Sequence, residues 1–422
     1  MAISRTLQAT RGEKVSYQRS PHLIPSTISH HPHNHCFSFS EKTRSARFRE
    51  RRGGRERKGN FLFLGFLRDM GCSGFNGFLV VLMLVLGVCR GSSSNAYISW
   101  DDLSLGGGSD ELEVGKREKG RERVIVVAQD GSGDSRTVQG AIDLVPRGNY
   151  QRVKIFIKQG FYREKVLVPY YKPCISLIGE KRSRTMISWH SRASDPGPNG
   201  HMLGTFNSAS VAIESDYFCA SWITFENTAP SPPPGAVGMQ AVALRVSGDK
   251  AVFANCRVLG SQDTLFDENG RHFFYRSYIQ GSIDFIFGSG RSLYQECTLR
   301  STATSYGAIA ASQRNSATEN SGFAFLNCRL NGTGSLYLGR AWGRYARVVY
   351  AFCNLDDIII PEGWYDWGDP SRRGTVVFGE YKCKGRGANM KRRVAWAKSL
   401  TYDEAKPFLG RNYIDGNQWL VL

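Results

Sequence analysis

The chain has 422 residues, of which 41% are hydrophobic, 12% aromatic and 22% charged, a composition that excludes an intrinsically disordered or collagen-like protein. The net charge is +18, but residues 1–69 alone hold 14 basic against 5 acidic residues, so half of the excess lies in the first sixth of the chain. The remaining body is only moderately basic and carries no zinc-finger, RNP or recognition-helix motif, which argues against nucleic-acid binding.

Residues 1–69 form a basic leader that we predict to be disordered. The leader contains the Arg-rich run from Arg44 to Lys58 and five of the eight histidines. Four of these histidines lie within six positions and could bind a metal, but no pattern of Cys or carboxylate ligands accompanies them. A disordered leader is therefore the better interpretation, and no metal is predicted.

An apolar stretch, Phe78–Val88, follows the leader. It is shorter than the roughly 18–20 residues that a membrane span needs, and small residues between Gly91 and Ala96 follow it, as in a secretory signal. We therefore predict a secretory signal over 70–96, with Met70 as a candidate true start. A linker over 97–121 and a secreted, extracellular body over 122–422 would follow, with no stable membrane span after processing. A signal anchor that is never cleaved is the alternative.

The body consists of short β-branched and aromatic runs flanked by Gly, Asn or Asp, which indicate strands. A four-residue phrase with an aromatic residue first and a small residue last recurs at intervals of 20 to 31 residues. It stands at Phe225–Thr228, Phe253–Cys256, Phe274–Ser277, Tyr294–Cys297, Phe325–Cys328 and Tyr350–Cys353. Such spacing is typical of a solenoid whose coils stack like residues in register. We predict an all-β, single-stranded parallel β-helix, although a β-sandwich could give a similar density of strands.

One helical segment stands near the start of the body, at Val138–Val145. We expect this short helix to cap the open end of the solenoid, because an exposed strand edge has to be covered. The body also contains seven cysteines without a CxxC motif, so at least one thiol is expected to be free unless it pairs between chains.

Two carboxylates form the most suggestive constellation in the body. Asp263, in QDTL, and Asp284, in DFIFG, are 21 residues apart, close to the local repeat. In a solenoid this interval places the two acids on neighbouring coils of one face, where strands lie about 4.7–4.9 Å apart. Gln240 precedes Gln262 by 22 residues, so the amides are expected to extend the same column. The alternative is that the acids are turn residues and the glutamines form stacked amide ladders.

Close carboxylates raise one another's pKa above the usual value of ~3.9. One acid can then be protonated while the other is ionised, as acid–base chemistry requires. Arg340, in LGRAW, is the candidate cation that holds one of them ionised, and Trp342 offers a flat apolar platform beside it. By contrast, none of the body's three histidines lies near a serine-nucleophile motif, so a Ser–His–Asp mechanism is not expected.

Five motifs follow one another in order: GFYRE at 160–164, QAVAL at 240–244, QDTL at 262–265, DFIFG at 284–288 and LGRAW at 338–342. Through them the body resembles a plant-type pectinesterase (pectin methylesterase), without the inhibitor-like pro-region. The resemblance implies a right-handed parallel β-helix that hydrolyses the methyl esters of homogalacturonan (pectin) to pectate and methanol in the cell wall. It implies no cofactor, a monomer, and a proteinaceous pectinesterase inhibitor as a candidate partner.

The resemblance also implies residue roles. Asp284 would be the nucleophile, Asp263 the general acid and base, and Gln262 the donor that stabilises the oxyanion. Four further residues would contact substrate: Thr205, Gln240, Arg340 and Trp342. A catalytically inactive pectin-binding wall protein on the same solenoid is the alternative function.

Three positions depart from the family pattern. Ala341 stands where the family usually has Pro, which we expect to loosen the loop that presents Arg340 and Trp342. Phe266 replaces a common Tyr, and Ser277 stands where many relatives have Cys, so a family disulfide is expected to be missing.

Overall fold

The computed structural model describes residues 97–105, 123–198, 200–233 and 236–422. The predicted leader, the predicted signal segment and most of the predicted linker lie outside the described residues. Within the described residues no helix is long and apolar enough to cross a membrane.

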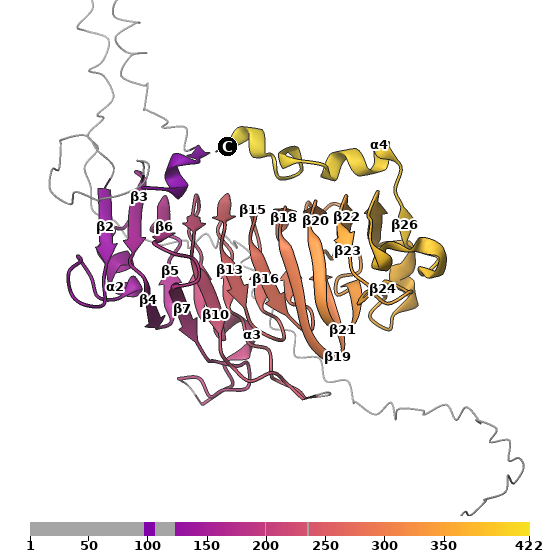
Figure 1. Ribbon diagram of the computed structural model, residues 1–422, viewed down its shortest axis with the longest axis horizontal. Helices are drawn as coiled ribbons and strands as arrows, with labels where there is room; N and C mark the ends of the chain where they lie inside the picture. The colour runs from indigo at the N-terminus through magenta and orange to yellow at the C-terminus, as the bar shows by residue number, and fades with distance from the viewer. Residues whose placement is uncertain (1–96, 106–122, 199, 234–235) are drawn as a thin grey trace, which may run out of the picture. The chain divides into compact units, whose positions relative to one another are not determined.

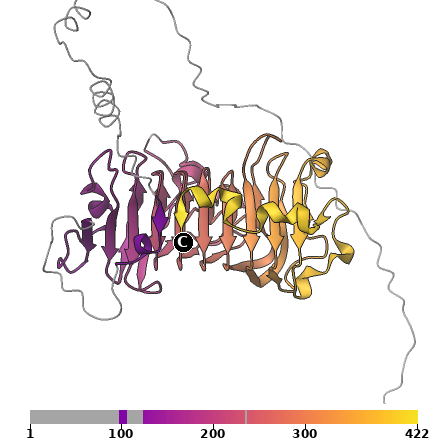
Figure 2. The same cartoon turned by 90° about the horizontal axis from the view of Figure 1, so that it is seen from above.

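The body is a solenoid in which each full coil gives one strand to each of three parallel sheets (Figures 1 and 2). Sheet 1 contains β2 (Arg123–Val127), β3 (Val153–Ile157), β6 (Ile175–Gly179), β9 (Cys219–Ser221), β12 (Ala251–Ala254), β15 (Arg271–Tyr275), β18 (Arg291–Gln295), β20 (Gly322–Leu326), β22 (Arg347–Ala351), β25 (Val377–Tyr381) and β26 (Lys398–Ser399). All of its neighbouring strands are parallel. The predicted parallel β-helix is thereby confirmed.

Sheets 2 and 3 meet along two long strands, β19 (Thr298–Ser312) and β21 (Arg329–Arg340), which bend from one sheet into the other. Sheet 2 also contains β4 (Gly160–Arg163), β7 (Thr185–Trp189), β10 (Thr224–Asn227), β13 (Arg257–Leu259), β16 (Tyr278–Gly281) and β23 (Asn354–Leu355). Sheet 3 also contains β5 (Val166–Val168), β8 (Val211–Ile213), β11 (Leu244–Val246), β14 (Leu265–Asp267), β17 (Ile286–Gly288) and β24 (Trp364–Tyr365).

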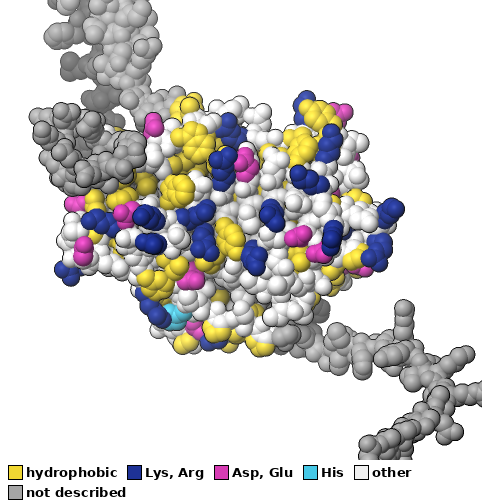
Figure 3. All heavy atoms as spheres, viewed as in Figure 1, with side chains coloured by type: hydrophobic (Ala, Val, Ile, Leu, Met, Phe, Trp, Pro, Cys, Tyr) yellow, Lys and Arg dark blue, Asp and Glu magenta, His cyan; other side chains and the backbone are white. Residues whose placement is uncertain are grey.

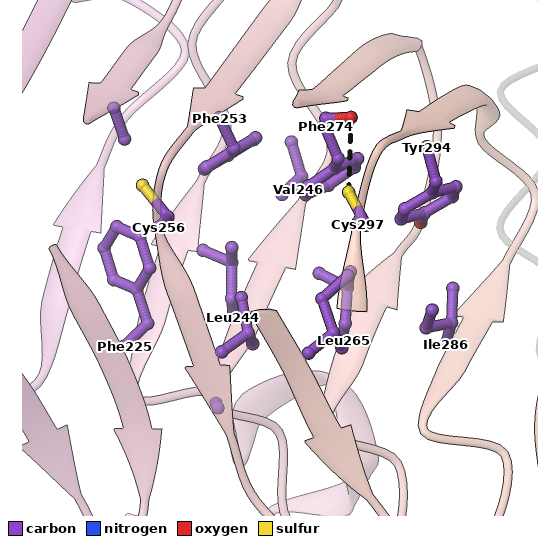
Figure 4. Close-up of a cluster of buried hydrophobic side chains, with 14 of the residues drawn as sticks. Phe225, Leu244, Val246, Phe253, Cys256, Leu265, Phe274, Ile286, Tyr294 and Cys297 are labelled. Atoms are coloured by element: carbon purple, nitrogen blue, oxygen red, sulfur yellow. Dashed lines mark hydrogen bonds between the residues drawn. The ribbon is translucent and has the colours of Figure 1, made fainter. Parts of the chain in front are cut away.

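The recurring aromatic phrase builds the interior. Its last five aromatic residues occupy paired positions on sheet 1, from Phe253 to Tyr350, and their rings stack with centroids 4.5 to 4.9 Å apart (Figure 4). The first phrase was assigned wrongly, because Phe225 lies on β10 in sheet 2 and meets Phe253 edge-on. In that coil Ala220, on β9, occupies the position opposite Phe253.

The end of each of the last five phrases makes the turn from sheet 1 to sheet 2. The third residue has a positive φ, as at Asn255, Arg276 and Glu296 with φ of 47° to 56°, and its N–H donates to the next coil. We call this row the outer turn ladder. The fourth residue points back inside, where only a small side chain fits, and Cys297 there donates its thiol to the Phe274 carbonyl oxygen (Figure 4). All seven cysteines of the described body are unpaired.

The predicted capping helix forms as α2 (Val138–Asp143), two residues shorter than expected. Thr137 caps it by accepting from the Gly140 N–H, and Glu164 accepts from the next free N–H groups at Val138 and Gln139. Its buried residues join the interior of the solenoid.

A C-terminal strap covers the outer face of sheet 1 (Figures 1 and 2). It consists of α4 (Tyr402–Ala405), the short 3-10 helices η5 (Lys406–Phe408), η6 (Arg411–Ile414) and η7 (Gly416–Gln418), and β27 (Leu420–Val421). Strand β1 (Ile98–Ser99) pairs with β27, and strap residues such as Ile414 and Trp419 form a second apolar core with sheet 1.

Candidate active site

Asp263 and Asp284 lie on neighbouring coils, at the turns that lead from sheet 2 into sheet 3. Each precedes its strand by two residues, and the strands pair in register, with Leu265 opposite Ile286. The Asp263 N–H donates to the carbonyl oxygen of Ile283 at 3.0 Å, which joins the two turns. Both acids have positive φ, 60° and 46°. The structure therefore brings together the two carboxylates that the 21-residue interval predicted.

Arg340 holds Asp284 through two contacts. Its Nε donates to Asp284 Oδ1 at 2.7 Å, and its Nη2 donates to Oδ2. Strand pairing explains this reach across the chain, because β19 lies between β17 and β21 and places Arg340 at the end of β21 beside the acids. The two side chains are largely buried, at 15% and 8% exposure. A two-point pair of this kind fixes the direction of the carboxylate.

Asp263 differs electrostatically from its neighbour. Burial raises the pKa of the Asp263 carboxyl well above its ordinary value, and the charge of Asp284 raises it further, while Arg340 acts in the opposite direction. The two acids therefore occupy different environments, one paired with a guanidinium and one disposed to keep its proton. Such a division between two carboxyl groups is the arrangement that acid–base catalysis uses.

The two predicted glutamines lie beside the acids, but not in one strict column. Gln262 directly precedes Asp263, and its carbonyl oxygen accepts from the Ala241 N–H at 3.2 Å. Ala241, rather than Gln240, therefore occupies the matching position on the preceding coil. The interval of 22 residues causes this offset of one. Both side chains are half-buried, and within the described residues neither amide donates to a protein group. The amides are free to meet a substrate oxygen.

Thr205 comes from a separate loop that folds against the same edge. It belongs to the short helix α3 (Gly204–Asn207), whose C-terminal residue Ser208 donates back to the Thr205 carbonyl oxygen. The Ser208 hydroxyl also accepts from the Val242 N–H at 3.1 Å, which attaches the helix to the QAVAL segment. The predicted Thr205 is thus placed beside the strand that Gln240 leads into.

Trp342 lies next to an aromatic row that sequence reasoning did not identify. Phe206 meets Phe266 edge-on at 6.5 Å, Phe266 stacks on Phe287 at 4.4 Å, and Phe287 lies 6.0 Å from Trp342. Phe266 and Phe287 are paired across sheet 3 on its outer side, since Leu265 and Ile286 beside them point inside. An aromatic residue at the middle of both β14 and β17 was the sequence signal that could have revealed this row.

Trp367 was also missed. The Arg340 guanidinium carbon lies 4.2 Å from the centre of the Trp367 ring. This cation–π contact holds the arginine that pairs with Asp284. Trp367 comes from an irregular segment after β24 and has a φ of 64°, so no strand interval pointed to it.

The loop that carries Arg340 and Trp342 is firmly held, contrary to the expected effect of Ala341. The Ala341 N–H donates to the carbonyl oxygen of Tyr365 at 2.9 Å, a bond that a proline could not make. The Arg372 guanidinium also donates to the carbonyl oxygens of Ala341 and Trp342. Among the described residues no group of three His, Cys, Asp or Glu could hold a metal ion.

Comparisons with known proteins agree with the fold and show the family. The family model described as Pectinesterase matches residues 124–417. "Pectinesterase QRT1" of Arabidopsis thaliana is 56% identical over 344 residues, which cover 77% of this chain and 90% of the relative. "Probable pectinesterase 8" of the same plant is 43% identical, covering 70% of this chain and 76% of the relative.

Solved structures agree with the sequence relatives. "Pectin methylesterase from Carrot" aligns with a TM-score of 0.66 and 34% identity over 72% of this chain and 96% of that chain. A pectin methylesterase solved in complex with a hexasaccharide aligns with a TM-score of 0.60 and 26% identity, covering 69% of this chain and 96% of its own.

Proposed function

This chain belongs to the pectinesterase family and is an ester hydrolase, and on that premise we propose that it demethylates homogalacturonan with Asp284 as the nucleophile. The observation that carries the proposal is the pairing of Asp284 with Arg340 beside an acid, Asp263, whose pKa is raised. One carboxylate is thereby oriented by a guanidinium, while its neighbour is disposed to keep its proton.

In the first half of the reaction, an Asp284 oxygen attacks the carbonyl carbon of a galacturonate methyl ester. Negative charge develops on the carbonyl oxygen, and the free amides of Gln262 and Gln240 donate to it. Asp263 gives its proton to the departing methoxide, so that methanol leaves and an acyl-enzyme anhydride with Asp284 forms.

In the second half, Asp263 is ionised and takes a proton from a water molecule. The hydroxide attacks the acyl carbon, the bond to Asp284 breaks, and pectate is released with both acids restored to their starting states. Arg340 holds Asp284 in position throughout. The aromatic row from Phe206 to Trp342 supplies the apolar surface on which neighbouring sugar rings pack.

Methanol release from esterified pectin tests the proposal directly. The purified protein is expected to release methanol, and Asp284→Asn is expected to lose at least about 10³-fold in turnover because an amide is no nucleophile here. Asp357→Asn is the matched control, because Asp357 is an exposed carboxylate at a distant surface pair with Arg386. Near-normal methanol release by Asp284→Asn would refute the assignment, whereas a wild-type protein that binds pectin without releasing methanol would establish the inactive wall-protein alternative.

We also propose that the protein acts outside the cell, in the wall. The apolar stretch Phe78–Val88 with small residues after it supports a secretory signal. N-terminal sequencing of the secreted protein tests this, and a mature chain that still begins before residue 70 would contradict it.

A further inference from the structure

A hollow of about 430 Å³ lies between the C-terminal strap and the N-terminal ends of strands β18, β22 and β25 of sheet 1. It is on a different face from the catalytic acids. This volume is within the range of small-molecule sites. Its polar lining comes from two arginines, Arg291 and Arg347, and two asparagines, Asn320 and Asn412, while Phe408 belongs to its apolar wall.

The strand register explains why the hollow exists. The first residues of β15, β18, β20 and β22 are Arg271, Arg291, Gly322 and Arg347, and they form one row on the outer side of sheet 1. Gly322 interrupts the row with a φ of +132°, and a Cβ there would lie 2.8 Å from the Arg347 Cβ. A side chain at position 322 would collide with the Arg347 side chain, so the glycine leaves Arg347 the space to reach the hollow.

The charges around the hollow are not balanced within it. Its described lining contains two arginines and no carboxylate. Arg291 donates to Asp415 at 2.7 Å, but Asp415 is shared with Arg271, which also pairs with Asp249. Arg347 forms no ion pair with a carboxylate of the described chain.

A third guanidinium lies beside Arg347, outside the lining of the hollow. Arg314 next to Arg347 donates only to backbone carbonyl oxygens, those of Ala317, Glu319 and Tyr345. Burial lowers its pKa, and the charge of Arg347 lowers it further. The charge of Glu319 acts in the opposite direction on Arg314, and this carboxylate also accepts from the Asn315 N–H and the Ser321 hydroxyl.

Arg291 has an unmet hydrogen-bonding need. Its buried Nε has no acceptor among the described residues, and a buried donor without an acceptor is unfavourable. An anion entering beside it would supply the missing acceptor and reduce the repulsion between Arg291 and Arg347.

We propose that this hollow is a second binding site, which takes the carboxylate of a short uronate oligosaccharide. The guanidiniums of Arg347 and Arg291 bind the carboxylate, Asn320 and Asn412 bind hydroxyl groups, and the apolar wall at Phe408 packs on the sugar ring. A methyl ester at the same position would remove the charge that the arginines recognise. The choice of a uronate rests on the proposed function, because pectate is its product, whereas the existence of an anion site does not.

The test measures binding of trigalacturonate by calorimetry on the full chain carrying Asp284→Asn, so that esterified probes are not hydrolysed. Two molecules per chain are expected, one in the catalytic groove and one in the hollow. Arg347→Gln should weaken the second by about 10-fold or more, because a charge-assisted contact is lost. Arg329→Gln is the matched control: Arg329 is exposed on sheet 2, so the same charge is removed elsewhere, and less than twofold change is expected.

A second variant keeps the test informative if Arg347→Gln folds poorly. Asn320→Asp places a carboxylate in the hollow, which should raise the Tm of the free protein while weakening trigalacturonate binding. Equal losses in Arg347→Gln and Arg329→Gln would overturn the site, as would equal affinity for the fully methylated trimer. Inorganic phosphate binding as tightly as trigalacturonate would overturn the uronate assignment. A wild-type chain that releases no methanol but binds through Arg347 would refute the proposed function and leave the anion site standing.

Discussion

Two rows of turns in this solenoid use the same backbone device for different ends. The outer turn ladder, between sheets 1 and 2, and the turns that carry Asp263 and Asp284, between sheets 2 and 3, both place non-glycine residues at positive φ on consecutive coils. In the outer turn ladder, Arg276 and Glu296 are neighbours of opposite charge, and their side chains are 58% and 36% exposed.

At the turns of Asp263 and Asp284, by contrast, two acidic side chains are neighbours, one half-buried and the other buried. Asp284 is 8% exposed and is paired with Arg340, and burial together with the charge of Asp284 raises the pKa of Asp263. In both rows, the coil geometry only brings the side chains of neighbouring coils close together. Sign and burial of the neighbouring charges decide whether proximity gives a surface ion pair or a reactive pair of acids.

The largest expected effect follows from removing the proton donor. Asp263→Asn should lower methanol turnover by about 10³-fold, because an amide cannot transfer the proton to methoxide. The same change should raise the Tm at pH 7, since the folded protein no longer has to hold a buried carboxyl that would ionise when unfolded. Turnover together with thermal unfolding checks both signs, and a variant that is inactive and also less stable would contradict the electrostatic explanation.

The next effect concerns the cation of the pair. Arg340→Lys keeps the charge but loses the two-point contact with Asp284 and the stacking on Trp367. We expect kcat to fall by about 10²-fold with a smaller change in KM. Steady-state kinetics on pectin would measure this split, and full activity would mean that charge alone suffices.

The pH dependence sharpens the comparison further. Because the pKa of Asp263 is raised in the folded state, its contribution to stability is fully present below the unfolded value of ~3.9 and is lost as pH rises through the folded value. Turnover should fall above the folded value, where Asp263 loses its proton, by up to about tenfold per pH unit. Asp263→Asn should show neither dependence, and profiles that do not change in this variant would exclude Asp263 as the titrating group.

The backbone device itself predicts a smaller effect. Asn255, in the outer turn ladder, has a φ of 54°, a conformation that Asn tolerates better than Ala. Asn255→Ala should lower the free energy of unfolding by about 1 kcal/mol, and Asn255→Gly by less. Denaturant unfolding separates the two variants, and equal losses would mean that side-chain contacts, rather than φ, determine the choice of Asn.

The smallest effect is expected at the exposed pair. Glu296→Gln removes the charge partner of Arg276 and should change the free energy of unfolding by less than about 0.5 kcal/mol, with methanol turnover unchanged. This variant is the control that matches Asp263→Asn, because both replace an acid with its amide at a positive-φ turn position. A substantial loss of turnover would show that the two rows of turns are coupled.

Sequence intervals predicted the part of the site that depends on coils of equal length. Asp263 and Asp284 are separated by one regular coil, so counting residues was enough to place them together. Phe225 was misplaced because Ala220 occupies the sheet 1 position of its coil. The aromatic phrase of that coil lies on sheet 2 instead. Trp367 could not be found by counting, since it reaches Arg340 from an irregular segment.

The pairing of β1 with β27 joins segments from near the two ends of the described chain. The strands that form the apolar outer face of sheet 1 all precede Trp419 and Leu420 in the chain, so during synthesis they emerge before these residues can cover them. A nascent or prematurely terminated chain that lacks these last residues exposes part of this apolar face, although the rest of the solenoid is complete. The C-terminal strap therefore protects the finished solenoid from aggregation through this face.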